Sequence, residues 1–275
     1  MPVSLARARG RQGGGGDRLP DICPGLTEDR AFFRKGQSSL IVGGTGSGKS
    51  AFMMAYLIKH RVPTLYISAD QDEYTSRLRA GAIVLQRPQE YVEALLASEA
   101  EVLVDEALQE LDFLQFCFTP APHGERIVME LAAYIEINGA APEAVVIDNA
   151  RNVYEGDDEW TGLVEVMDQC QYLGRETGAA IIALHHTLES QQTDTTKPAA
   201  RHKTSGKILQ GWELILSVAS DPEVNEYYLA AVKCRLGRAD PSAKRYATMY
   251  TDLASMSFWE DEAAYRLAQK MGEWT

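Results

Sequence analysis

One eight-residue segment has the residue types and the spacing that bind phosphate groups. It combines four glycines with a lysine, two serines and a threonine, in the order Gly43, Gly44, Thr45, Gly46, Ser47, Gly48, Lys49 and Ser50. Glycines let backbone N–H groups converge on phosphate oxygens without clashes from Cβ atoms. In this motif the lysine reaches the β- and γ-phosphates of a nucleotide, and the serine hydroxyl ligates Mg²⁺. The segment therefore predicts a phosphate-binding loop for ATP and Mg²⁺.

The residues on either side predict a strand before this loop and a helix after it. Leu40–Val42 is an apolar run typical of a buried parallel strand, and the run 50–60 places apolar residues on one side of a helix. The positive end of that helix would face bound phosphate. A flexible turn rich in glycine and serine is the alternative interpretation, and this context disfavours it.

An acidic residue at the end of another apolar run is a second candidate for the nucleotide site. Ala144–Ile147 is followed directly by Asp148, about a hundred residues after the loop. In ATPases with such a loop, a carboxylate in this place belongs to the Mg²⁺ shell. Many buried strands end in aspartate, which is the alternative interpretation of this residue. We predict Ser50 and Asp148 as the metal-site residues.

Apolar runs that alternate with helix-length stretches predict an α/β fold with a parallel sheet covered on both faces. The later runs lie closer together, which favours antiparallel pairing at one edge. The expected strands are Ser39–Val42, Thr64–Ser68, Phe113–Phe118, Ala144–Ile147, Ala179–Leu184, Leu214–Val218, Tyr228–Lys233 and Ala247–Tyr250.

Composition and charge indicate the domain organisation of the 275 residues. Residues 1–22 are predicted to be a flexible, basic, glycine-rich arm, 23–262 one ATPase domain, and 263–275 a short helix or tail. The arm is either a disordered leader or an electrostatic contact to DNA or an acidic partner. The net charge of -12 disfavours a protein coated with nucleic acid, although a local basic groove remains compatible with it. Scattered cysteines and the lack of a long apolar run predict a cytoplasmic protein that does not enter a membrane.

Four further short segments follow the order and spacing of one known family. They are Ser68-Ala69-Asp70-Gln71, Ala183-Leu184-His185-His186, Ser205-Gly206 with Gln210, and Lys233-Cys234-Arg235 with Gly237. Together with the phosphate-binding loop and the Asp148 strand, they make residues 25 to 260 resemble the RecA-type ATPase core of DnaB-like replicative DNA helicases, the small phage-encoded type in particular.

This resemblance implies a P-loop NTPase fold, with a RecA-like, mostly parallel twisted sheet flanked by helices. It also implies an ATP hydrolase whose active sites form at the subunit interfaces of a homo-oligomer, a hexameric ring in this family. Single-stranded DNA and replication proteins are the expected partners, and the host cytoplasm is the expected location of a phage-encoded protein.

Asp70 stands where the family usually has the glutamate that activates the attacking water. Aspartate is one methylene shorter, so either the water lies closer to the sheet or a neighbour such as Glu73 takes this role. Asp70 also precedes a stretch that is predicted to be helical, so a helix N-cap is the alternative interpretation.

The resemblance also assigns roles to two groups late in the sequence. Lys233 and Arg235 face the same way on an expected strand, and in the family such a pair reaches the γ-phosphate held by the neighbouring subunit. His186 corresponds to the γ-phosphate sensor, because only one of His185 and His186 can face the nucleotide. Ordinary surface charges and a hydrogen-bonded histidine at a strand end are the alternatives. The catalytic candidates are thus Lys49, Asp70, His186, Lys233 and Arg235.

Two loops are candidates for DNA contact, because the corresponding loops line the central channel in the family. The first, 152–160, is acidic, which disfavours contact with phosphate. The second carries Lys197, Arg201 and Lys203, and cations of this kind follow the backbone of a single strand. A mobile, solvated loop is the alternative interpretation of this basic cluster.

Two other function classes remain open from the sequence. A RecA-like recombinase would form filaments for strand exchange, but residues 1–23 contain no convincing polymerisation motif. A regulatory or helicase-loading ATPase would act through protein partners, and the acidic net charge suits this class. Binding of single-stranded DNA at low salt discriminates the last class from a DNA motor.

Overall fold

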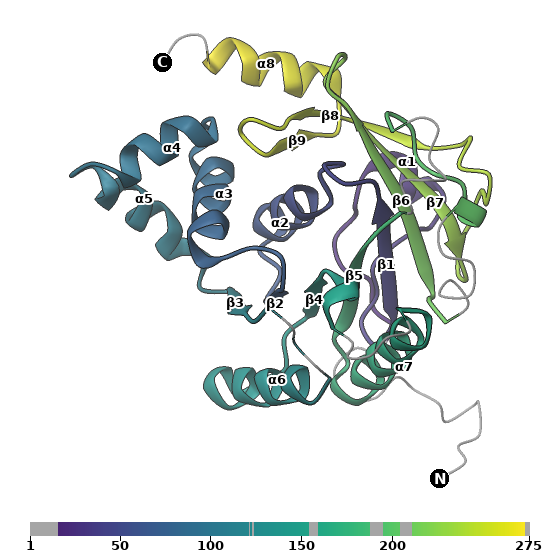
Figure 1. The fold of residues 1–275 in the computed structure, drawn as a ribbon. Coiled ribbons are helices and arrows are strands. Elements are labelled where there is room, and N and C mark those ends of the chain that lie inside the picture. Colours follow the sequence, from purple (N-terminus) through teal and green to yellow (C-terminus); the bar gives the residue numbers. More distant parts are fainter. Residues whose placement is uncertain are drawn as a thin grey trace.

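The structure is a computed structural model that describes residues 16–120, 122, 124–153, 159–187, 195–203 and 211–272. The described residues form a nine-stranded sheet in the order β3-β2-β4-β5-β1-β6-β7-β8-β9 (Figure 1). The strands from β3 to β6 in this order are parallel, and β7, β8 and β9 continue the sheet antiparallel. The strands are β1 Ser38–Gly43, β2 Thr64–Ser68, β3 Leu114–Phe118, β4 Ala144–Asp148, β5 Ala180–His186, β6 Leu214–Asp221, β7 Glu226–Cys234, β8 Ala247–Asp252 and β9 Ser257–Trp259.

The predicted α/β class, the mostly parallel sheet and all eight expected strands are confirmed. The last strand, β9, was not expected, because three residues are too few to show a period in the sequence. The α-helices are α1 Pro24–Glu28, α2 Lys49–His60, α3 Glu73–Leu85, α4 Gln89–Leu96, α5 Glu101–Leu108, α6 Gly124–Asn138, α7 Glu159–Thr177 and α8 Glu262–Gly272. In the part of the chain that the structure describes, none of the helices combines the length and apolarity needed to cross a bilayer.

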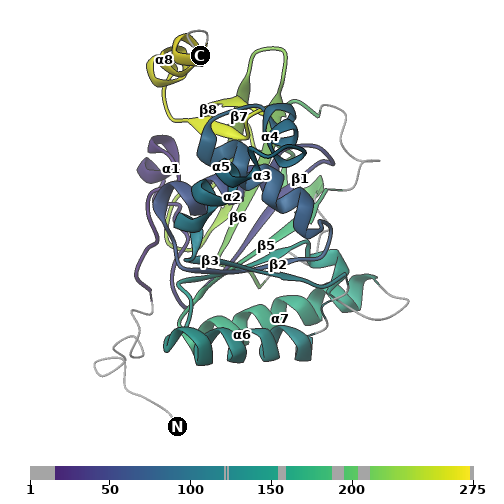
Figure 2. The same cartoon turned by 90° about the vertical axis from the view of Figure 1, so that its left-hand side faces the viewer.

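Helices cover both faces of the sheet, α6 and α7 on one side and α1 and α2 on the other (Figure 2). Successive side chains of a strand point to opposite faces, so β1 divides its apolar residues between two cores. Leu40 and Val42 join the core under α6 and α7, whereas Ile41 joins the core under α2. This alternation explains why the central strands are apolar at every position.

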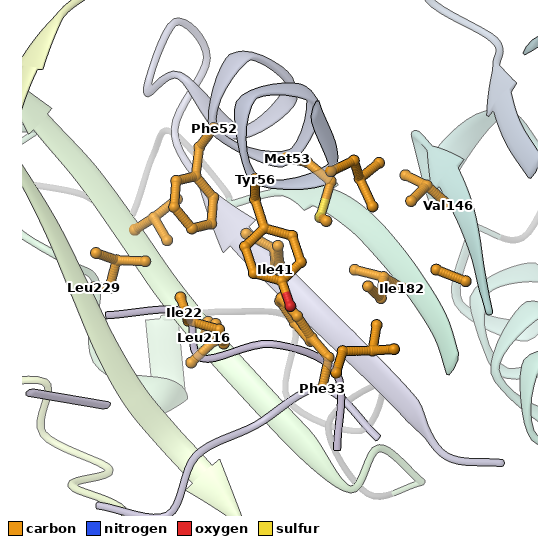
Figure 3. Packing of buried hydrophobic residues seen from close by; sticks show 14 of the residues in the cluster. Ile22, Phe33, Ile41, Phe52, Met53, Tyr56, Val146, Ile182, Leu216 and Leu229 are labelled. Atoms are coloured by element: carbon orange, nitrogen blue, oxygen red, sulfur yellow. The ribbon is translucent and has the colours of Figure 1, made fainter. Parts of the chain in front are cut away.

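The core on the α2 side fixes the helix that follows the phosphate-binding loop. Phe52, Met53 and Tyr56 of α2 pack onto Ile41 of β1 and Ile182 of β5 (Figure 3). All of these side chains are nearly inaccessible to solvent. Burial of these apolar side chains holds α2 in one position on the sheet, and with it the loop at the N-terminus of α2.

The first described residues are packed on this core, unlike the expected arm over 1–22. Leu19 and Ile22 are buried in it, and the Leu19 N–H donates to the Phe33 carbonyl at 2.8 Å. The Tyr56 hydroxyl donates to the Pro20 carbonyl at 2.7 Å. Apolar side chains at Leu19 and Ile22 attach this segment to the domain, so the packed part of the chain begins before residue 23.

Candidate nucleotide site

The phosphate-binding loop joins the carboxyl end of β1 to the first turn of α2. Gly46 and Gly48 have φ angles of 74° and 79°, in the left-handed region that favours glycine. A Cβ atom on Gly43 would lie 2.6 Å from Ser47 Oγ and 2.7 Å from the Val218 carbonyl oxygen. The glycines of the motif are therefore needed for the course of the backbone as well as for space around a ligand.

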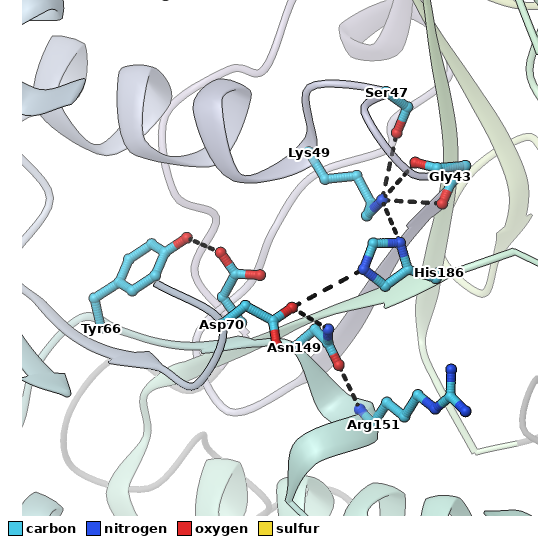
Figure 4. Close-up of polar contacts among 10 residues, drawn as sticks. Gly43, Ser47, Lys49, Tyr66, Asp70, Asn149, Arg151 and His186 are labelled. Atoms are coloured by element: carbon cyan, nitrogen blue, oxygen red, sulfur yellow. Dashed lines mark hydrogen bonds and ion pairs between the residues drawn. The ribbon is translucent and has the colours of Figure 1, made fainter. Parts of the chain in front are cut away.

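Lys49 lies at the centre of a hydrogen-bond network in this loop (Figure 4). Its Nζ donates to the carbonyl oxygens of Gly43 and Gly44, both at 2.9 Å, and lies 3.3 Å from His186 Nδ1. Burial lowers the pKa of Lys49 to about 8, although the carboxylates of Asp148 and Asp70 oppose this change. The ammonium is thus poorly solvated and would gain from an anionic partner.

The lowered pKa of Lys49 makes nucleotide affinity depend on pH. Bound phosphates would raise this pKa. The contribution of the charged Lys49 to nucleotide binding is therefore complete below pH 8 and is lost as the pH rises above 8. We expect the affinity for ATP to fall by up to about tenfold per pH unit above this point. Titration with a fluorescent ATP analogue between pH 7.5 and 9.5 measures this slope. Lys49→Met should bind weakly with no such slope, and a flat profile for the unmodified protein would contradict the prediction.

Asp148 lies at the end of β4, beside β2, with only 4% of its surface exposed. Its Oδ2 accepts a hydrogen bond from the Tyr66 hydroxyl at 2.8 Å. Burial raises the pKa of Asp148, and hydrogen bonds from Ser50 and Tyr66 oppose this rise. Ser50 and Asp148, which the sequence places about a hundred residues apart, therefore meet at one point.

The donor set at this point fits Mg²⁺. The hydroxyl of Ser50 and the carboxylate of Asp148 are hard oxygen ligands, which Mg²⁺ prefers. Among the described residues, no group of three or more His, Cys, Asp or Glu side chains could hold a metal by itself. Mg²⁺ usually binds through one or two protein oxygens together with phosphate oxygens and water.

Asp70 follows β2 and lies in the same pocket, which has a volume of about 350 Å³ and is also lined by Lys49, Asp148 and His186. Asn149 Nδ2 donates to Asp70 Oδ2, and His186 Nε2 lies 4.0 Å from the same oxygen. The Asn149 side chain is itself held, because its Oδ1 accepts from the Arg151 N–H at 2.8 Å. A carboxylate in this place can polarise a water next to a bound γ-phosphate.

The structure contradicts the helix-cap interpretation of Asp70 and places Glu73 at another groove. The N-cap of α3 is Asp72, whose Oδ1 accepts from the Thr75 N–H at 2.7 Å, so the helix-cap interpretation of Asp70 is wrong. Glu73 is exposed and lines a separate groove beside β3, outside the nucleotide pocket. Asp70 is thus the carboxylate of this segment that lines the pocket.

The two histidines at the end of β5 point to opposite faces of the sheet. His186 lies on the α2 side and lines the pocket, between Lys49 Nζ and Asp70 Oδ2. His185 is buried, and burial lowers its pKa to about 4. His186 is therefore the histidine in contact with the nucleotide pocket.

Lys233 and Arg235 lie at the opposite end of the sheet from the phosphate-binding loop. Cys234 pairs with Leu214 of β6, which pairs with Ser39 of β1, four residues before Gly43. At about 3.3 Å per residue, this places the pair roughly 13 Å back along the strands. The Arg235 guanidinium is exposed and lies 3.4 Å from Glu213 Oε1. Within one subunit, therefore, the two cations and the pocket are separated.

Of the predicted DNA-binding residues, Arg201 is exposed, whereas Lys197 and Lys203 are partly buried. Lys197 Nζ lies 3.7 Å from the centre of the Tyr228 ring, and a hydrogen bond with Tyr228 raises its pKa. Arg201 and Lys203 are the ends of a short 3-10 helix. The pKa of Lys233 is lowered by burial first and then by the charge of Arg235, and the charge of Arg201 makes a smaller contribution. Ser205, Gly206, Gln210 and residues 154–158 of the acidic loop lie outside the described residues.

Comparisons with known proteins identify relatives of the chain, although no family model matches it. The Gene 65 protein of Mycobacterium phage L5 is 35% identical over 251 residues, which cover 86% of this chain and 91% of the relative. The Gene 65 protein of Mycobacterium phage D29 is 33% identical over 221 residues, covering 76% and 93%. The chain belongs to the family of these phage Gene 65 proteins.

Solved structures define the fold of this Gene 65 family member. One of them, an isolated ATPase domain, has a TM-score of 0.74 at 16% identity, covering 91% of this chain and 94% of that one. A DnaB-like replicative helicase has a TM-score of 0.70 at 15% identity, covering 82% and 58%. The RadB recombinase has a TM-score of 0.52 at 15% identity, covering 84% and 93%. The chain therefore has the RecA-like fold of DnaB-like helicase ATPase domains.

Three residues at the pocket of this Gene 65 family member were not found from the sequence. Tyr66 and Asn149 hold the two carboxylates, and Arg79 of α3 lines the pocket with a buried Nε that has no hydrogen-bond partner among the described residues. Asn149 follows Asp148 directly in the sequence, and this adjacency was the one indication that Asn149 lies near the pocket. Tyr66 resembles any other apolar residue of a buried strand, and Arg79 resembles a surface residue of a polar helix.

Proposed function

We propose that this chain is the ATPase subunit of a DNA helicase-like motor, which hydrolyses ATP at subunit interfaces and translocates on single-stranded DNA in replication. The supporting observation is the division of the candidate residues into two groups. The pocket collects Lys49, Asp70, Asp148 and His186, whereas Arg235 lies at the other end of the same sheet. In this proposal, each site takes its Arg235 from a second subunit.

In this proposal, the pocket residues bind MgATP and activate water. The backbone N–H groups of the loop and the Lys49 ammonium hold the phosphates, and Ser50 and Asp148 hold Mg²⁺, which neutralises developing charge. Asp70 orients and polarises the attacking water, and Asn149 fixes the carboxylate that does so. His186 contacts both Lys49 and Asp70, so it can respond to the presence of the γ-phosphate.

Lys233 and Arg235 of each subunit act on the nucleotide of its neighbour. The guanidinium of Arg235 is 53% exposed, whereas the Glu213 carboxylate beside it is largely buried, so Arg235 would leave this ion pair to reach the neighbouring site. A head-to-tail contact that joins this edge to the next pocket is heterologous, and repeated contacts of this kind form a ring when the rotation between subunits closes. A hexamer is the closed form that we propose.

The DNA contact is assigned to the basic segment 197–203. Lys197 holds the segment on the Tyr228 ring, and Arg201 and Lys203 of the short 3-10 helix would contact the phosphates of a single strand. Because the charge of Arg201 acts on Lys233, a movement of this segment on binding DNA would change the electrostatic environment of the interface cations.

The proposal predicts an ATPase that single-stranded DNA stimulates. The double variant Arg201→Ala/Lys203→Ala should lose most of this stimulation, about tenfold, and should show a weaker salt dependence of DNA binding. Arg266→Ala/Lys270→Ala on α8 removes the same charge elsewhere and should behave as the unmodified protein. The measurement is the ATPase rate against DNA concentration at several salt concentrations.

Other outcomes of this measurement would favour other functions. A low rate that DNA does not change, together with no DNA binding at low salt, would favour a regulatory or helicase-loading ATPase. Helical filaments in electron micrographs, in place of rings, would favour a recombinase.

A further inference from the structure

Tyr66 joins the strand β2 to the carboxylate at the end of β4. Its hydroxyl donates to Asp148 Oδ2 at 2.8 Å (Figure 4). Tyr66 pairs with Val146, two residues before Asp148, and both side chains lie on the α2 face of the sheet. The phenol therefore extends along the sheet by roughly 7 Å to reach the carboxylate. A shorter polar side chain in the middle of β2 would not span this gap.

The ring of Tyr66 is held in place by its surroundings. It is 1% exposed, and its centre lies 4.9 Å from that of the Phe116 ring on β3. The hydroxyl has Ser50 as a further hydrogen-bonding neighbour, besides Asp148. It thus contacts both protein groups that the proposed function assigns to the metal, from the side of the protein interior.

A buried carboxylate needs a hydrogen-bond partner for the oxygen that does not face the ligand. Tyr66 is the partner of Oδ2, and Asp148 lines the pocket, so its other oxygen would be the one to face Mg²⁺. Outer partners of this kind orient metal-binding groups, and their loss typically lowers metal affinity by 10–100-fold. A phenylalanine in the same place would keep the packing and remove the donor alone.

We propose that Tyr66 is a positioning residue for the metal site, whose hydroxyl holds Asp148 and Ser50 in the arrangement that binds Mg²⁺. The inference rests on the proposed function, because it takes Asp148 and Ser50 as the metal-site pair. It adds a requirement for a tyrosine at position 66 of β2, which is not part of the nucleotide-binding motif. Binding of the metal thereby depends on a residue in the middle of a core strand.

The test compares Tyr66→Phe with Tyr56→Phe by titrating Mg²⁺ against the binding of a fluorescent ADP analogue. Tyr56 is a matched control, since it is also buried and its hydroxyl donates to Pro20, outside the pocket. We expect the half-saturating Mg²⁺ concentration to rise about tenfold in Tyr66→Phe and to stay unchanged in Tyr56→Phe. Binding of the analogue in EDTA should be the same in both variants. Thermal melting of both variants reports on their folding.

A double-mutant cycle with Asp148→Asn tests whether Tyr66 acts through Asp148. In that background Tyr66→Phe should cause no further loss of Mg²⁺ affinity. An unchanged Mg²⁺ requirement in Tyr66→Phe, or a full additional loss beside Asp148→Asn, would overturn the inference and leave the proposed function intact. If Mg²⁺ had no effect on nucleotide binding by the unmodified protein, the proposed function would fail, and the inference with it.

Discussion

The variant Arg235→Ala is expected to lose about 10³-fold or more in ATPase rate while it still binds ATP. Arg235 lies outside the pocket of its own subunit, so removal of its side chain leaves the phosphate-binding loop complete. The guanidinium supplied to the neighbouring site would stabilise charge only in the transition state, so its loss lowers the rate more than the affinity. Steady-state rates and binding of a fluorescent ATP analogue, measured on the same samples, check this expectation.

A matched control separates this effect from the loss of a surface ion pair. Arg266 of α8 is also exposed and pairs with Glu262, so Arg266→Ala removes an exposed arginine and its ion pair at a residue that is not part of the proposed site. It should leave the rate unchanged. A rate in Arg235→Ala within a few-fold of that of Arg266→Ala would contradict the proposed role of Arg235.

Asp70→Asn is expected to show the second largest effect, a fall of about 10²–10⁴-fold in rate. The amide has almost the shape of the carboxylate but cannot accept a proton from the attacking water. Affinity for the nucleotide should change little, or rise, because a negative charge next to the phosphates is removed. Single-turnover hydrolysis and nucleotide binding measure the two quantities separately.

Glu73→Gln is the control for Asp70→Asn. Glu73 is three residues away and exposed, and it lines the groove beside β3 and not the nucleotide pocket. The same chemical change there should leave the rate unaltered. If Glu73→Gln lost activity and Asp70→Asn kept it, water activation would have to be reassigned.

The fold was predictable because the strands are apolar at consecutive positions and the helices are not. Runs such as Ala144–Ile147 can only be buried on both faces, which indicates a parallel sheet covered by helices. The packing of segment 16–22 was not predictable in this way, since two apolar residues among polar ones do not form a periodic pattern. Leu19 and Ile22 are buried by the tertiary structure alone.

The candidate site was predictable where its geometry is local and unpredictable where it depends on strand order. The phosphate-binding loop is continuous in sequence, so its spacing was sufficient to identify it. Tyr66 reaches Asp148 only because β2 and β4 are neighbours in the sheet, which the order of the strands along the chain does not reveal. Asp70 and Asp72 both precede α3, and only the structure distinguishes the cap from the pocket residue.

The number of basic residues in segment 197–203 does not indicate which of their charges contact other parts of the protein. Lys197 counts as a free cation in the sequence, whereas its ammonium lies on the Tyr228 ring. The ring comes from Tyr228 of β7, about thirty residues after Lys197 in the sequence, so no local pattern indicates this contact.

Mixing two inactive variants tests most directly whether each site takes its arginine from a neighbouring subunit. Lys49→Ala lacks a working phosphate-binding loop but retains Arg235, and Arg235→Ala has the opposite defect. In a mixed assembly with random pairing, about a quarter of the interfaces combine the two intact halves. The ATPase rate of the mixture, with single-stranded DNA present, should therefore rise far above that of either variant alone. A mixture that stays as inactive as its components, although the two variants co-assemble, would contradict hydrolysis at subunit interfaces.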